Sequence, residues 1–275
     1  MLTLGLLIAL LGISSPVSTG PEYAECYENT FCVEAEDAGN RVDIYVRSLV
    51  DWEVTISLEV EMANMRPDTA MPLVQSMPGK KRTHALSLKV RDIGYPWSFS
   101  YNLTWIPGDT RAQHDADALY ELPFAKGTSY AVGQGFQGRE THQGTYAIDF
   151  LLPEGAPVHA ARGGTVVDTA DRFTEGKLDP ALKTAGNFVT IRHDDGTFGY
   201  YVHFKHQGVV VRPGDRVETG QLIGYSGNTG YSSGPHLHFE VFSTTKDMSS
   251  RTLPIRFRTG RHGVTYLEEG QRYRR

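Results

Sequence analysis

The stretch Gly234-Pro235-His236-Leu237-His238-Phe239-Glu240-Val241 decides which fold is expected for the second half of this 275-residue sequence. After Pro235 the pattern is typical of a β-strand, in which residues two apart project from the same face. The side chains of His236 and His238 then begin about 6–7 Å apart, because a strand rises roughly 3.3 Å per residue. Two imidazoles at this separation fit one metal-centred site, with one binding the ion and the other reaching its water or a substrate.

Two segments further upstream contain residues that could complete such a site. Thr141–Phe150 includes His142 and Asp149, and Tyr200–Phe204 includes His203. Two histidines and one aspartate leave the fourth zinc position open for water, which is the arrangement of a catalytic site rather than of a closed structural one. Zinc there lowers the pKa of its water and polarises a carbonyl oxygen. The remaining histidines can supply the base and the oxyanion donor that hydrolysis needs.

The histidines are unevenly distributed along the chain. Seven of the ten lie between residues 142 and 238, among glycine-containing turns. A single His-x-His pair is weak evidence, since many such pairs are surface residues of strands. The ordered set favours one convergent site over unconnected surface histidines, and the helical His-Glu-x-x-His signature of common zinc proteases is absent.

The composition bounds the class of protein. The chain has 27 Lys+Arg against 32 Asp+Glu and a formal net charge of −5, which argues against a general nucleic-acid binder. Its hydrophobic fraction of 40% suffices for packed cores, and its length favours two domains. Two cysteines cannot form a four-cysteine zinc site or a disulfide-dense scaffold.

The first half alternates between apolar and polar residues with a period of two, which predicts strands with one face on a core. Several such strands with turns between them favour an antiparallel β-sandwich over residues 21–107. All three tryptophans lie on the apolar faces, where core packing is a better interpretation than a sugar-binding platform. A polar linker, residues 108–122, follows Pro107-Gly108-Asp109. The apolar alternating positions are Val42, Ile44, Val46, Trp52, Val54, Ile56, Leu58, Val60, Met62, Leu86, Leu88, Val90, Trp97, Phe99, Tyr101, Leu103 and Trp105.

The first twenty residues have the pattern of a secretory signal peptide, residues 1–20. The apolar run Leu2–Ile13 is too short to span a membrane and is followed by small residues and a proline. It lacks a preceding Lys or Arg, so a buried N-terminal helix is the alternative. We expect an exported protein, periplasmic or secreted, with no membrane span after this run. Cys26 and Cys32 could then close a small disulfide loop, the alternative being two free buried thiols.

At this point residues 123–243 resemble the M23 peptidases, the LytM- and lysostaphin-like zinc endopeptidases that cut peptidoglycan cross-bridges. The resemblance implies an all-β chain, with an M23-type β-sheet groove domain (barrel-sandwich-like) following the sandwich. A groove with zinc at its floor would bind an extended peptidoglycan peptide. The motifs that carry the resemblance are Asp149–Arg162, Gly186–His193, Asp195–Thr197, Val211–Val217, Gly220–Gly224, Ser226–Gly230 and Gly234–Phe239.

The family pattern implies a role for each residue of the set. His142, Asp149 and His238 match the zinc ligands, while His236 and His203 match the pair that activates water and stabilises the tetrahedral intermediate. One departure concerns spacing, since the common pattern is His-x-x-x-Asp and here six residues separate His142 from Asp149. A longer loop could still return the imidazole to the metal.

Several alternatives accompany this interpretation. A non-catalytic cell-wall binding or amidase-activating protein with a vestigial zinc site would gain support if His142 were displaced from the metal. Val211–Gly224 also resembles the hairpins of lipoyl and biotinyl carriers, but the turn Gly227–Gly230 lacks the required lysine. The bond cut would be a D,D bond to diaminopimelate, which we favour, or a glycyl bond.

The other residues near the motifs are interpreted as ordinary. His159, His193 and His206 match no ligand position and are expected to be structural or peripheral. Residues 244–275 form a C-terminal extension that ends Arg272-Tyr273-Arg274-Arg275. The final stretch, Arg251–Arg275, is basic enough to contact an anionic wall polymer, but we expect a solvated tail.

Overall fold

The computed structural model describes residues 23–27 and 29–275, so the expected signal peptide lies outside the described residues. Within them the chain is all-β, as predicted, with a single 3-10 turn, η1 (Pro180–Leu182). No helix in the described ranges is long and apolar enough to cross a membrane. The strands of the first half are β1 (Tyr23–Tyr27), β2 (Phe31–Asp37), β3 (Arg41–Ser48), β4 (Val54–Ala63), β5 (Met65–Pro67), β6 (Leu73–Met77), β7 (Arg82–Val90) and β8 (Ser98–Pro107).

Fourteen further strands follow in the second half of the chain. They are β9 (Leu119–Glu121), β10 (Ser129–Gln134), β11 (Ala147–Phe150), β12 (Pro157–His159), β13 (Gly164–Ala170), β14 (Asn187–Arg192), β15 (Phe198–Val209), β16 (Arg216–Val217), β17 (Leu222–Ser226), β18 (Leu237–Thr244), β19 (Ser250–Thr252), β20 (Arg256–Thr259), β21 (Gly263–Thr265) and β22 (Arg272–Arg274).

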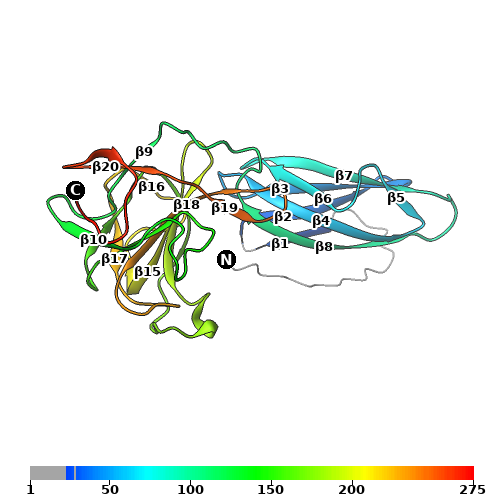
Figure 1. Ribbon diagram of the computed structural model, residues 1–275. Coiled ribbons are helices and arrows are strands. Elements are labelled where there is room, and N and C mark those ends of the chain that lie inside the picture. Colours follow the sequence, from blue (N-terminus) through cyan, green and yellow to red (C-terminus); the bar gives the residue numbers. More distant parts are fainter. Residues whose placement is uncertain (1–22, 28) are drawn as a thin grey trace. The chain divides into compact units, whose positions relative to one another are not determined.

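The chain forms two compact units (Figure 1). The first contains the described residues up to Arg111 together with Thr244–Ser249. The second contains Ala112–Ser243 and Ser250–Arg275. All five candidate site residues belong to the second unit, so the fold of that unit positions the site.

The first unit is an antiparallel sandwich. One sheet has the strand order β1-β2-β3-β7-β5 and the other β6-β4-β8. Apolar residues from both sheets form one core, including Val46 from β3 and Ile56 from β4, both fully buried. The three tryptophans are half-buried and pack against this core, as expected. The predicted disulfide is present and joins Cys26 to Cys32, which lie opposite each other on β1 and β2.

The second unit is built on a large sheet. Its main path runs β16-β13-β14-β15-β18-β11-β10-β22, with β12, β17 and β19 paired at its side. The pairings among the described strands leave this sheet open rather than closed into a barrel. Its core is rich in aromatic side chains, and β18 is buried along its whole length. A buried central strand can carry polar groups only if they have partners, which makes the histidine and glutamate on β18 informative.

The expectation of a solvated C-terminal tail is wrong. β22 pairs with β10, and β20 pairs with β9 and β21. Phe257 is fully buried and Tyr273 is 5% exposed, both in the core of the second unit. The exposed Arg272 and Arg274 flank Tyr273, so the segment alternates like a strand with one buried face. The expectation was wrong because it rested on the number of arginines in the segment and overlooked this alternation.

We predict that His193 makes the second unit sensitive to mild acid. Its Nδ1 lies 2.9 Å from the Gly163 carbonyl, and its Nε2 is buried without a partner. Burial lowers the pKa of His193 to about 4, so the unfolded chain binds a proton at a pH where the folded one does not. The resulting stability is complete above pH 6.5 and falls with pH down to about 4, by about 3 kcal/mol.

Denaturant unfolding at pH 7 and pH 4 measures this effect. The His193→Gln variant should lose less free energy of unfolding than the unmodified protein between these two pH values. His206→Gln, at an exposed position, is the control and should behave like the unmodified protein. An unchanged pH dependence in His193→Gln would contradict the prediction.

Candidate metal centre

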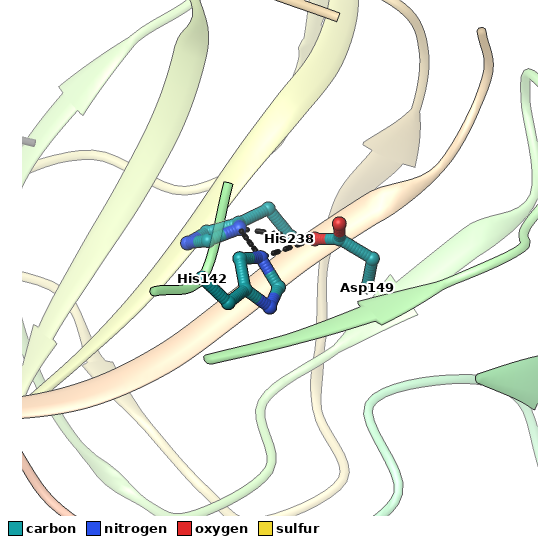
Figure 2. A group of neighbouring side chains, drawn as sticks. All are labelled: His142, Asp149 and His238. Atoms are coloured by element: carbon teal, nitrogen blue, oxygen red, sulfur yellow. Dashed lines mark hydrogen bonds and ion pairs between the residues drawn. The ribbon is translucent and has the colours of Figure 1, made fainter. Parts of the chain in front are cut away.

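Three side chains predicted as metal ligands converge on one point in the second unit (Figure 2). The Nε2 atom of His142 lies 3.3 Å from Nδ1 of His238 and 3.2 Å from Oδ1 of Asp149. Nδ1 of His238 lies 3.0 Å from the same Oδ1 atom. His142 and His238 are 1% and 6% exposed, so the triangle of ligand atoms is nearly closed to solvent.

The spacing of these atoms fits a small divalent cation. Ligand atoms held about 2.0–2.2 Å from a tetrahedral zinc ion lie about 3.3–3.6 Å from one another, close to the distances seen here. Two imidazole nitrogens and one carboxylate oxygen are a donor set that such an ion accepts. Because three protein atoms occupy three corners, the fourth corner remains for water or a substrate atom.

Register places Asp149 and His238 together. The two residues are directly opposed on the neighbouring strands β11 and β18. Facing residues of an antiparallel pair have Cβ atoms about 4.5–5.5 Å apart, so both side chains reach the same point. Burial alone would raise the pKa of Asp149, but the neighbouring imidazoles of His142 and His238 outweigh it and hold the pKa well below its usual range.

His142 reaches the same point from the loop between β10 and β11. Its Nδ1 atom lies 3.1 Å from the carbonyl oxygen of Gly135. A proton on Nδ1 satisfies that carbonyl and leaves the lone pair of Nε2 toward the centre, as a metal ligand requires. The six intervening residues therefore do not displace His142 from Asp149.

His238 differs from His142 because its Nδ1 atom, rather than its Nε2 atom, faces the centre. Its Nε2 atom lies 3.6 Å from the carboxylate of Glu240, which is 7% exposed on the same strand. Burial disfavours the charged imidazole, yet Asp149 and Glu240 together raise the pKa of His238 to about 10. The two carboxylates thus favour positive charge at this buried point, and a metal cation would compete with a proton for it.

His203 is the extra residue of a β-bulge in β15. Phe188 pairs with Val202 and Asn187 pairs with Phe204, so His203 has no partner of its own on β14. Its φ of 72° lies in the left-handed region, which non-glycine residues seldom adopt and which concentrates at functional sites. Nδ1 lies 2.6 Å from the Thr229 carbonyl, and burial lowers the pKa of His203 to about 3.

His236 lies beside His203, with ring centroids 4.4 Å apart. Its Nδ1 is 2.8 Å from the Gly234 carbonyl and 3.2 Å from the Ser232 hydroxyl, while Nε2 is 3.7 Å from Oδ1 of Asp149. Burial lowers the pKa of His236. Both imidazoles are therefore neutral near pH 7, with Nδ1 directed to a carbonyl and Nε2 available to accept a proton.

The structure brings all five predicted site residues together and leaves the other histidines apart. His159 lies on β12, His193 contacts Gly163, and His206 is exposed; none of them joins the ligand triangle. Sequence reasoning missed two polar residues that touch the ligands, Glu240 and Gln134. Glu240 had a signal in its even spacing from His238 on a buried strand, whereas Gln134 belongs to no motif that we identified.

Three converging ligand atoms with two further histidines beside them are typical of a metallopeptidase site. Residues 142–250 match the sequence profile of Peptidase family M23, so this part of the chain carries an M23 peptidase domain. The family assignment agrees with the resemblance seen in the motifs of the second half.

The chain is similar to several curated proteins. An uncharacterized metalloprotease of Buchnera aphidicola is 36% identical over 54% of this chain and 37% of its own length. The peptidoglycan DD-endopeptidase ShyA of Vibrio cholerae is 39% identical over 42% of this chain and 25% of its own. The chain thus spans less than two fifths of the length of these curated relatives.

A similar solved structure is the catalytic domain of lysostaphin from Staphylococcus simulans. It is 30% identical in sequence, and the match covers 50% of this chain and 95% of that one, with a TM-score of 0.33.

We predict that His142 is required for tight metal binding in spite of its unusual spacing. Removing one of three ligands in His142→Ala should weaken binding of Zn²⁺ by more than the about 10–100-fold loss seen for outer-shell changes. Competition with a chromogenic chelator on metal-stripped protein measures the affinity. His206→Ala should bind like the unmodified protein, and an equal affinity in His142→Ala would remove His142 from the ligand set.

Proposed function

We propose that this chain is a zinc-dependent endopeptidase that hydrolyses peptide bonds in peptidoglycan cross-bridges. The observation that carries the proposal is the convergence of His142, Asp149 and His238 with His203 and His236 beside them. The first three would hold the metal and the last two would perform proton transfer. The match of residues 142–250 to Peptidase family M23 supports a peptidase, and the mixed nitrogen and oxygen donors support zinc.

The chain's own residues supply the proton chemistry. Zinc bound at the triangle would activate a water molecule and polarise the carbonyl group of the scissile bond. The neutral Nε2 of His236 or His203 accepts the proton of the attacking water, since both Nδ1 atoms are directed to main-chain carbonyls. The imidazolium so formed can donate to the developing oxyanion or to the leaving amine.

The two histidines are suited to different parts of this cycle. His236 lies 3.7 Å from Oδ1 of Asp149, whose negative charge favours the protonated imidazole. His203 is more strongly held neutral by burial and by the neighbouring His236 and His238. We assign His236 to take and hold the transferred proton, and His203, whose neutral Nε2 is an acceptor, to contact the attacking water.

The relatives guide the proposal for the substrate. ShyA is named a peptidoglycan DD-endopeptidase, and ALE-1 of Staphylococcus capitis, 34% identical over 41% of this chain, a glycyl-glycine endopeptidase. We propose a D,D bond to diaminopimelate as the bond cut. The catalytic domain would comprise residues 123–243, after a sandwich domain (21–107) and a linker (108–122), and with an extension (244–275).

We further propose that the protein acts outside the cytoplasm, in the periplasm or after secretion. The Cys26–Cys32 disulfide supports this location, because such bonds form and persist in oxidising compartments. Peptidoglycan peptides would be the partner, with no role for nucleic acid. A non-catalytic binding or amidase-activating protein is the alternative, and a digest distinguishes it.

Purified protein incubated with peptidoglycan should cut its cross-linked peptides in the presence of zinc and give peptides that are no longer cross-linked. Mass analysis of the products identifies the bond that is cut, and a chelator should abolish the release because the triangle would lose its ion. His238→Ala should be as inactive as chelator-treated protein, while His206→Ala stays active. Zinc binding without any released product would instead support the non-catalytic alternative.

Substitution of either proposed catalytic histidine should slow hydrolysis without loss of zinc, unlike substitution of a metal ligand. His203→Ala and His236→Ala should each retain zinc near one ion per chain yet lower the hydrolysis rate by about 10²–10⁴-fold, the usual contribution of general acid–base catalysis. Metal analysis and the digest rate measure the two properties on the same samples. A variant that loses zinc as His238→Ala does would be reassigned to the ligand set.

A further inference from the structure

Gln134, the last residue of β10, contacts both the loop that carries His142 and the carboxylate of Asp149. Its side chain lies between the loop that carries His142 and the strand that carries Asp149, and the residue is 6% exposed. In the sheet, Gln134 is directly opposed to Asp149 on β11. Register therefore sets the amide beside the carboxylate before any loop contact is considered.

The oxygen of this amide receives three main-chain donors from the loop. The N–H groups of Glu140, Thr141 and His142 lie 3.1, 2.9 and 3.2 Å from Oε1. Three successive N–H groups that point at one oxygen fix the backbone on which the His142 imidazole is mounted. Of the three, the N–H of His142 belongs to a buried residue, and leaving such a group without a partner costs about 1–3 kcal/mol.

The nitrogen of the amide completes the link. Nε2 donates to the Thr141 hydroxyl at 2.8 Å and to Oδ2 of Asp149 at 3.2 Å. Oδ2 is the carboxylate oxygen that does not face the two imidazoles, so the contact leaves Oδ1 for the centre. The amide cannot be reversed, because its NH₂ group would then meet three N–H donors.

We propose that Gln134 is the positioning residue that holds His142 and Asp149 at ligand distance across their six-residue separation. This inference rests on the proposed metal site, and it explains how a loop longer than the usual family spacing returns His142 to its place. The main chain of the loop and the His142 ring are both fixed at the end of β10, by Gln134 and by the carbonyl of Gly135.

A close approach of the loop supports the same assignment independently. A Cβ atom at Gly138 would lie 2.4 Å from Cγ of Gln134. The loop therefore crosses directly over the glutamine side chain, and only glycine leaves room for it. Gly138→Ala should therefore disturb the hydrogen bonds between the Gln134 side chain and the loop while the amide itself remains.

The test measures metal affinity rather than activity. Gln134→Met keeps the size of the side chain and removes every polar contact, so we expect Zn²⁺ affinity to fall by about 10–100-fold, the range for outer-shell partners of a metal site. Gly138→Ala should lower the affinity in the same direction and serves as the second variant if Gln134→Met folds poorly. Replacing zinc with Co²⁺ gives an absorption spectrum that should change in both variants as the ligand geometry loosens.

A matched control comes from another buried amide in the same unit. Asn187 is fully buried and bonds the main chain of Phe173 and Phe204, and none of these contacts is to a residue of the ligand triangle. Asn187→Leu should lower stability while its zinc affinity stays within about threefold of the unmodified protein. An equal loss of affinity in Asn187→Leu would show a general effect of destabilisation and overturn the inference.

The remaining outcomes show whether the role of Gln134 or the metal site itself is wrong. Zinc affinity and a cobalt spectrum unchanged in Gln134→Met would overturn the role of Gln134 and leave the metal site standing. An unmodified protein that binds no zinc would overturn the metal site, and the positioning role with it. Loss of affinity in Gln134→Met and Gly138→Ala, with Asn187→Leu unaffected, would establish the positioning role.

Discussion

The pairing of β11 with β18 is the constraint on which the rest of the site depends. It sets Asp149 opposite His238 in the middle of a buried sheet. A slip of one residue would move every side chain of β18 to the other face and separate the two ligands. The fully buried Phe239, whose neighbours on the strand are His238 and Glu240, opposes such a slip because it anchors the opposite face in the core.

The pairing matters chemically because it buries two carboxylates next to His238. Asp149 and Glu240 lie on either side of His238, and their combined attraction keeps positive charge in a region from which water is largely excluded. A lone buried carboxylate would cost several kcal/mol, whereas one that faces imidazoles or a cation is compensated. The same two carboxylates that make a protonated His238 favourable without metal would stabilise a divalent ion in its place.

Sequence patterns predicted the parts of this site that follow strand periodicity. His236 and His238 share a face, and Asp149 lies on a short strand, as their alternation indicated. The bulge at His203 could not be predicted, because it depends on an unequal count of residues between β14 and β15. Gln134 was equally hidden, since its role arises from its partner across the sheet and from a loop folded back over it.

The orientation of the four histidines follows from what lies behind each ring. His142, His203 and His236 each have Nδ1 against a main-chain carbonyl, of Gly135, Thr229 and Gly234, so each presents Nε2. His238 is mounted on the central strand with Glu240 behind it, and it presents Nδ1 instead. Loop carbonyls and one buried carboxylate thus decide which nitrogen faces inward, and fixed neutral tautomers of His203 and His236 leave two proton acceptors beside the metal ligands.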